Sequence, residues 1–200
     1  MTRARAATTE LPRVGKRAAS LPPDERRSMI VAATLPLLLE HGEMVTTRQI
    51  ADAAGIAEGT IFRVFSDKDA VISAVLEAAF DPGPLERSLA AIDRELPFED
   101  CVEAAVELLQ QRVVDIWRLV SSIGTRFHDQ ARRPQVESDA LVRLFDLNRA
   151  RLTVEPVLAA RLLRAFTLSV THPMLAGEPM APPEIVALFL HGVCAEPSPC

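Results

Sequence analysis

The sequence predicts an all-α protein, with a small N-terminal unit of three helices followed by a larger helical unit. Apolar residues recur at helical spacing along most of the chain, and no segment shows the period-2 alternation of a strand. The most regular stripe consists of Val102, Val106, Leu109, Val113, Ile116 and Val120. Asp81-Pro82-Gly83-Pro84 interrupts the helical pattern, so we place the boundary between the two units there.

The composition is that of a soluble globular protein. The 200 residues fit a small domain plus a larger one, and 48% hydrophobic with 24% charged residues argues against disorder. No apolar run approaches the ~18 residues of a membrane span, and no secretory signal is apparent. Cys101, Cys194 and Cys200 form no C-x-x-C pair, which favours free thiols over a disulfide framework or a metal site. We expect a cytoplasmic protein without membrane association.

Charge is distributed unevenly. The net charge is −5, yet residues 1–20 hold five basic side chains against Glu10 alone, whereas residues 71–200 hold twelve basic and eighteen acidic ones. A basic front end on an acidic body suggests a polyanionic partner. Basic tails are also often only solubilising, so this feature does not decide alone.

The N-terminal unit is predicted over residues 23–81, after a flexible basic arm over residues 1–22. Leu21-Pro22-Pro23-Asp24 is typical of a helix start, because proline is tolerated in the first turn. The helix is expected to reach Glu40, with Gly42 as its C-cap. A later helix is expected from Asp67 to Phe80, opened by a second capping box over Ser66–Asp69.

Two short helices are predicted between these, within residues 46–65. Thr46-Thr47-Arg48-Gln49 is a capping box that starts the first, with Ile50, Ala53 and Ala54 facing inward. Gly55 ends that helix, because glycine adopts the left-handed conformation without strain. The second helix is expected over residues 58–64. This arrangement is typical of a helix-turn-helix, in which the second helix enters a DNA major groove about 12 Å wide. An ordinary αα-hairpin uses the same turn and stays an alternative.

In the C-terminal unit, residues 82–200, helices are predicted over 85–96, 99–122, 156–171 and 183–193, with an apolar segment at 141–145. The last two are apolar on nearly every side and therefore need cover all round. We expect the same helices of a second subunit to provide it, in a homodimer with a four-helix interface. The alternative is a fully internal helix pair.

Large apolar residues and two histidines on successive helices of this unit predict a small-molecule pocket or, alternatively, only a filled core. The candidate pocket residues are Trp117, Phe127, His128, Phe145, Phe166 and Met174, and they suggest an apolar effector. No serine, cysteine or histidine has a catalytic context and no spacing calls for a metal. We therefore expect no enzyme, no catalytic residue, no metal and no cofactor.

The stretch "TTRQIADAAGIAEGTIFRVFSDKDAVISAV" resembles the DNA-binding segment of the TetR-type (tetracycline-repressor-like) transcriptional regulators. The matching features are the paired threonines, the I-A-x-x-A-G-I run, G-T-I-F, a phenylalanine three residues further on and a lysine opening the next helix. The close resemblance covers about residues 24–80. Over residues 81–200 only the layout is similar, namely a helical body whose last two helices dimerise.

The resemblance implies DNA-contacting roles. Thr47 and Arg48 would contact phosphate, Gly59, Thr60 and Arg63 would face the groove, and Lys68 would bind the backbone. Glu58 and Phe62 belong to the same surface but depart from the family, because lysine or another polar residue is common at the first position and tyrosine at the second. Ala57 stands where serine is usual, so the second helix lacks a side-chain cap.

We therefore expect a homodimeric, ligand-responsive DNA-binding transcriptional regulator. It would most simply be a repressor released from a palindromic operator in double-stranded DNA by a small apolar effector. The alternative is a helical protein-binding adaptor on the same scaffold, without specific DNA binding; Glu58 and the missing cap are its best support.

Overall fold

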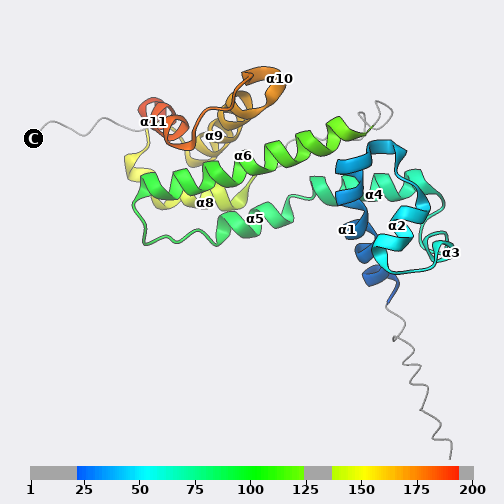
Figure 1. Ribbon diagram of the computed structural model, residues 1–200. Helices are drawn as coiled ribbons and strands as arrows, with labels where there is room; N and C mark the ends of the chain where they lie inside the picture. Colours follow the sequence, from blue (N-terminus) through cyan, green and yellow to red (C-terminus); the bar gives the residue numbers. More distant parts are fainter. Residues whose placement is uncertain (1–21, 124–136, 194–200) are drawn as a thin grey trace, which may run out of the picture.

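The computed structural model describes residues 22–123 and 137–193, and these ranges contain helices and no strand. The predicted all-α class is confirmed. The helices form two groups at opposite ends of an elongated molecule, and α6 (Phe98–Ser122) runs from one group to the other (Figure 1).

The N-terminal group consists of α1 (Pro23–His41), α2 (Thr47–Ala54), α3 (Glu58–Ile61) and α4 (Lys68–Phe80), with a 3₁₀ turn at Gly42–Met44. Its helices pack around one hydrophobic cluster. The fully buried members with large side chains are Ile30, Leu38, Ile50, Ile61, Ile72 and Leu76. The expected start of α1 and its C-cap at Gly42 are confirmed, the latter with φ 59°.

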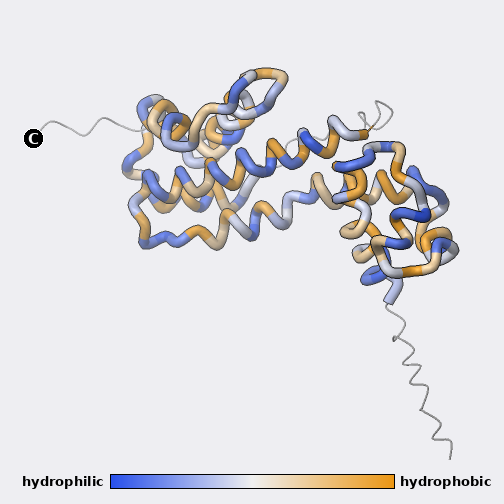
Figure 2. The backbone as a smooth tube through the Cα atoms, in the orientation of Figure 1, coloured by the Kyte–Doolittle hydropathy of each residue, from blue (hydrophilic) through white to orange (hydrophobic). Residues whose placement is uncertain are grey.

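The body consists of α5 (Gly83–Ala90), α6, α8 (Asp139–Leu147), α9 (Pro156–Thr171), α10 (Pro173–Ala176) and α11 (Pro182–Val193), with a 3₁₀ turn at Arg149–Arg151. α9 has the predicted bounds. A second hydrophobic cluster joins α5, α6, α8, α9 and α11, with Phe145 fully buried between Phe98 and Phe189. Apolar and polar segments alternate along these helices, as expected for helices with one buried face (Figure 2).

The prediction of a helix over 85–96 was wrong at both ends. α5 starts at Gly83, because Pro82 lies at the N-cap and Pro84 within the first turn, where proline is tolerated. It ends at Ala90, where local polar contacts replace the helical pattern: the Arg94 guanidinium donates to the Leu89 carbonyl, and the Asp93 carboxylate accepts from the Glu95 amide.

The second half of the predicted α6 stripe is also different from the prediction. Val102, Val106 and Leu109 are buried in the body, whereas Val113, Ile116 and Val120 are only partly buried. The end of α6 instead buries Leu119 and Ile123 in the N-terminal cluster. α6 is therefore a structural member of both groups, although the two hydrophobic clusters otherwise lie on either side of residues 81–82.

Candidate DNA-binding interface

α2 begins at the predicted capping box. The Thr46 hydroxyl accepts a hydrogen bond from the Gln49 amide at 3.2 Å, and the Gln49 side chain accepts from the Thr46 amide at 2.8 Å. The capping box thereby satisfies the backbone amides of Thr46 and Gln49 at the start of α2. Ile50 is fully buried, but Ala53, expected to face inward, is exposed, and Ala51 takes its place in the core.

A glycine turn fixes the angle between α2 and α3. Gly55 has φ 65° and ψ 33°, the left-handed conformation that the sequence predicts, and its amide donates to the carbonyls of Ala51 and Asp52. The Ile56 amide also donates to the Ala51 carbonyl, at 3.0 Å, while the Ile56 side chain packs against the N-terminal cluster. The turn is therefore held by both hydrogen bonds and apolar contact.

α3 is shorter than predicted, with one regular turn from Glu58 to Ile61. Beyond it, turn hydrogen bonds continue the coil, with the Phe65 amide donating to the Ile61 carbonyl at 2.8 Å. Ile61 and Phe65 anchor the segment in the core. Ala57 is the N-cap and makes no side-chain cap hydrogen bond, as expected.

The residues implied as DNA contacts lie on α2, on α3 and the turn that follows it, and at the start of α4, at the end of the molecule away from the body (Figure 1). Arg48, Glu58, Gly59, Phe62 and Arg63 are exposed, and Thr47, Thr60 and Lys68 are partly buried. Phe62 keeps 52% of its surface exposed, so this large apolar side chain is presented to solvent rather than packed. The helix-turn-helix thus presents two guanidinium groups, one carboxylate and an aromatic ring on its outer surface.

Two of the implied DNA contacts make hydrogen bonds within the protein that the sequence did not indicate. The Thr47 hydroxyl, on the first residue of α2, donates to the Glu58 carboxylate on the first residue of α3. The Lys68 ammonium donates to the Glu43 carbonyl at 2.7 Å, which ties the start of α4 to the turn after α1. The two residues of each pair are far apart in the sequence, so no local sequence pattern predicts these hydrogen bonds.

The N-cap of α4 is Asp67, not the Ser66 predicted by the second capping box. The Asp67 carboxylate accepts from the Ala70 amide at 2.8 Å and from the Ser66 hydroxyl at 2.9 Å. The Ala70 amide, and secondarily the Ser66 hydroxyl, lower the pKa of Asp67 below its ordinary value. An ionised aspartate at this end also complements the helix dipole.

The candidate pocket residues of the body have different environments. Phe145 is a core residue with no exposed surface, Met174 on α10 is 73% exposed, and Phe166 packs at the edge of the body core. The Trp117 ring lies 4.6 Å from the His172 ring, centroid to centroid. Phe127 and His128 lie outside the described residues. Phe145 therefore fills the core of the body, as the alternative interpretation expects. The small-molecule pocket itself stays a prediction.

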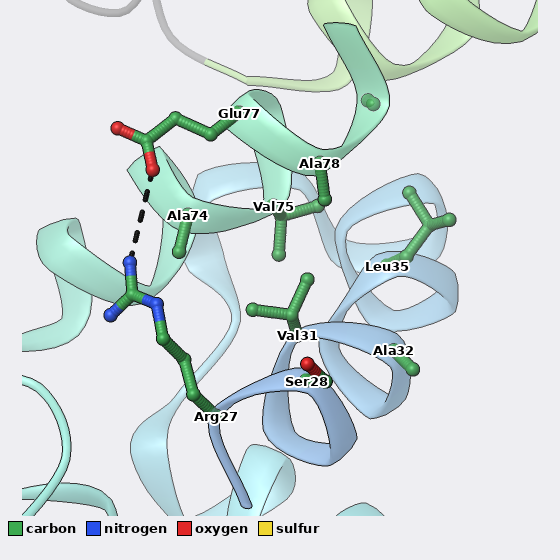
Figure 3. Close-up of a pocket in the computed structure, with 10 residues that line it drawn as sticks. Arg27, Ser28, Val31, Ala32, Leu35, Ala74, Val75, Glu77 and Ala78 are labelled. Carbon is green, nitrogen blue, oxygen red and sulfur yellow. Dashed lines mark ion pairs between the residues drawn. The ribbon is translucent and has the colours of Figure 1, made fainter. Parts of the chain in front are cut away.

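A hollow of about 480 Å³ lies elsewhere, between α1 and α4 of the N-terminal group (Figure 3). Its walls carry mostly small apolar side chains, including Val31, Ala74 and Ala78. The Arg27 guanidinium lies 3.8 Å from the Glu77 carboxylate across one side of it and stacks over the Phe65 ring at 4.6 Å.

Signs of catalytic or metal chemistry are sparse in the part of the chain that the structure describes. No group of three or more His, Cys, Asp or Glu side chains there is placed to hold a metal ion. Cys101 is a free, buried thiol whose pKa is raised by burial, and its sulfur lies 3.3 Å from the Asp93 carbonyl oxygen. None of the helices in these ranges has the length and apolarity to cross a bilayer. The expected absence of enzyme activity and cofactors stays a prediction.

Comparison with known proteins supports the TetR-type resemblance directly. Residues 30–75, from α1 to α4, match the family model described as bacterial regulatory proteins of the tetR family. No curated protein matches the sequence.

Solved structures of similar fold include three that cover most of the chain. A TetR-family transcriptional regulator from Mesorhizobium loti is 16% identical with a TM-score of 0.60, covering 88% of this chain and 100% of that one. Escherichia coli NemR in its reduced form is 18% identical with a TM-score of 0.59 and the same coverage. SmeT, the repressor of the Stenotrophomonas maltophilia multidrug efflux pump SmeDEF, is 20% identical with a TM-score of 0.54, covering 85% and 91%. At these identities the similarity establishes the fold.

Proposed function

We propose that this protein, which carries the DNA-binding domain of the TetR family, is a homodimeric repressor that a small apolar effector releases from a palindromic operator. The observation that carries the proposal is the α2–turn–α3 unit, whose capping box, left-handed Gly55 and exposed outer residues lie within the matched residues 30–75. A helix-turn-helix uses this geometry to place its second helix in the major groove.

The exposed cations supply the attraction to DNA. Arg48 at the start of α2 and Arg63 after α3 are exposed and carry the charge that phosphates and guanine edges require. Gly59 adds no side chain at the tip, and a Cβ there would meet nothing within 4 Å, so its surface is open to a close partner. Lys68 holds the Glu43 carbonyl and still has two further ammonium protons to offer a phosphate.

The last two long helices provide the proposed dimer surface. Leu158 and Leu162 lie one turn apart on α9 and are 43% and 41% exposed, and Leu188 on α11 is 56% exposed. Ala165 and Ala187, also exposed, are small enough to let a second pair of helices approach closely. An exposed apolar surface of this kind favours a two-fold, four-helix interface.

Effector control would act through the contacts between the body and the N-terminal group. Leu119 of α6 and Ile123, the C-cap residue of that helix, are buried in the hydrophobic cluster of the N-terminal group, where α6 packs against α1. The Arg112 guanidinium on α6 also donates to the Asp81 carbonyl at the end of α4, at 2.9 Å. A shift of α6 would therefore move α4 and change the separation of the two α3 tips. An effector achieves this only by binding one arrangement more tightly than the other.

The proposed effector site is in the body, with Trp117 and Phe166 as its first candidates and His172 beside Trp117 as a polar neighbour. Repression is the sign of regulation we propose, because SmeT, which shares the fold, is itself a repressor. Thermal melting against a panel of apolar and aromatic compounds tests the site. A compound that raises the Tm of wild type but not of Trp117→Ala supports it; no hit argues for a filled core.

A gel-shift titration distinguishes the DNA-binding regulator from the protein-binding adaptor. It uses a DNA duplex that the protein has enriched from a pool of random sequences. We expect specific binding that weakens steeply as salt rises, because phosphate contacts release counterions. Arg63→Ala should weaken binding to the enriched duplex more than to a random duplex, by roughly tenfold. Arg143→Ala, an exposed arginine on α8, is the control and should bind as wild type. A protein that enriches no sequence would favour the adaptor.

A further inference from the structure

The first residues of α2 and α3 are joined by a hydrogen bond that changes the role expected of both. The Thr47 hydroxyl donates to one oxygen, Oε1, of the Glu58 carboxylate. A threonine hydroxyl has a single proton to donate, so Thr47 cannot give it to a DNA phosphate while it holds Glu58. The phosphate contact implied for Thr47 is therefore replaced by a bond within the protein.

Glu58 is not occupied in capping its own helix. Ala57 is the N-cap of α3 and no side chain caps that end, while the Glu58 side chain is exposed and turned to Thr47. One carboxylate oxygen is held by Thr47 and the other, Oε2, remains an acceptor. Because the bond links two helices joined by the Gly55 turn, it restrains the carboxylate at the tip of the surface assigned to the DNA.

We infer that Thr47 and Glu58 form a base-reading unit, in which Thr47 positions Glu58 and Glu58 accepts a hydrogen bond from a cytosine amino group in each half-site. This inference rests on the proposed function. In the major groove a carboxylate can accept only from cytosine N4 or adenine N6. Adenine presents the N7 acceptor beside N6, and guanine and thymine present acceptors, all of which repel a carboxylate. Cytosine is thus the base that Glu58 selects.

The experiment is enrichment of bound duplexes from a random pool by the full chain and its variants, followed by sequencing. Wild type should enrich a palindrome with one strongly preferred cytosine in each half-site. Glu58→Gln should lose that preference by roughly tenfold and shift it toward adenine, because an amide presents both a donor and an acceptor. The rest of the motif should persist.

Thr47 is tested as a positioning residue. Thr47→Val, which removes the hydroxyl but keeps the shape, should weaken the preference at the same cytosine and at no other base. Thr47→Ser should restore it. A loss of binding spread evenly over all sequences, with unchanged base preference, would instead assign Thr47 to a phosphate and overturn its part in the unit.

The outcomes separate this inference from the proposed function. If Glu58→Gln enriches the same motif with the same cytosine frequency, the base-reading role is overturned while the regulator stands. If wild type enriches no motif at all, the proposed function fails and this inference fails with it. Melting curves matching wild type confirm that each variant is folded before its sequences are compared.

Discussion

Gly42 occupies a position that no other residue fits. Its φ of 59° with ψ of −146° is nearly exclusive to glycine, and a Cβ there would lie 2.3 Å from the Ser122 carbonyl oxygen of α6. The residue therefore both ends α1 and allows the end of α6 to approach the N-terminal group.

Gly42→Ala should lower the free energy of unfolding by about 3 kcal/mol or more, from backbone strain and overlap together. Gly55→Ala is the matched control, since Gly55 also has positive φ but a Cβ there meets nothing within 4 Å. It should cost only the left-handed conformation, ~1–2 kcal/mol. Denaturant titration measures both, and equal losses would show that the approach to α6 is unimportant.

Asp67 gives the stability of the N-terminal group a pH dependence. Its folded pKa is lowered, so its contribution is complete above the ordinary pKa near 3.8 and is lost as pH falls through the lowered folded value. Asp67→Ala should therefore melt below wild type at pH 7, with the difference shrinking at acid pH. Asp67→Ser, which can still cap, should retain more stability at pH 7 without that titration. A wild-type to alanine difference that is constant down to pH 2 would contradict this assignment.

Among the helices, α6 has the structural role that is hardest to predict from the sequence. Its heptad-like stripe predicts one continuous buried face. The buried face nevertheless changes partner along the helix, from the body at Val106 to the N-terminal group at Leu119. Leu119 is 1% exposed although it lies off the predicted stripe. Which helix covers a given position is decided by three-dimensional packing, and periodicity carries no information about that.

Leu119→Ala should lower the free energy of unfolding by about 2–5 kcal/mol, and the loss of stability should be concentrated in the N-terminal group. Hydrogen exchange should accelerate in α1 and α4 more than in α8 and α9. Leu109→Ala, also on α6 but buried in the body, should show the reverse distribution. Identical exchange patterns for the two variants would mean that the groups unfold as one unit and that α6 does not serve them separately.

The features predicted well from sequence are those fixed by neighbours in the chain. The Thr46–Gln49 capping box, the left-handed Gly55 and the bounds of α9 depend on contacts within a few residues, so the local pattern determines them. The family resemblance places Glu58 on the DNA surface. Its hydrogen bond with Thr47 could not be predicted, because the two residues are 11 positions apart and meet only once the turn between α2 and α3 has folded. Predicting the pocket residues requires knowledge of which apolar side chains are in contact. Those contacts depend on how the helices of the body pack together.

At the scale of the whole molecule, the proposed function requires that the body hold two helix-turn-helix units together. The exposed apolar side chains of α9 and α11 are the surface proposed for this purpose. If they form the interface, the helix-turn-helix units of two chains bind the two half-sites of a palindrome together. Specific binding then requires the dimer.

Leu162→Arg should turn the dimer into a monomer, because it places an unpaired charge in an apolar interface. Leu147→Arg is the matched control: Leu147 is 72% exposed on α8, outside the proposed surface, and should leave the dimer intact. Sedimentation equilibrium distinguishes the two. A Leu162→Arg variant that keeps the molecular mass of wild type would place the interface elsewhere.

The most direct test of the account is a hydroxyl-radical footprint of the full chain on its enriched duplex. Two α2–turn–α3 units held by one dimer should protect two patches of backbone related by a dyad. Their centres should lie about one helical turn apart, ~34 Å, on the same side of the DNA. A single protected patch, or uniform protection that follows no sequence, would contradict the claim that paired subunits present these units to an operator.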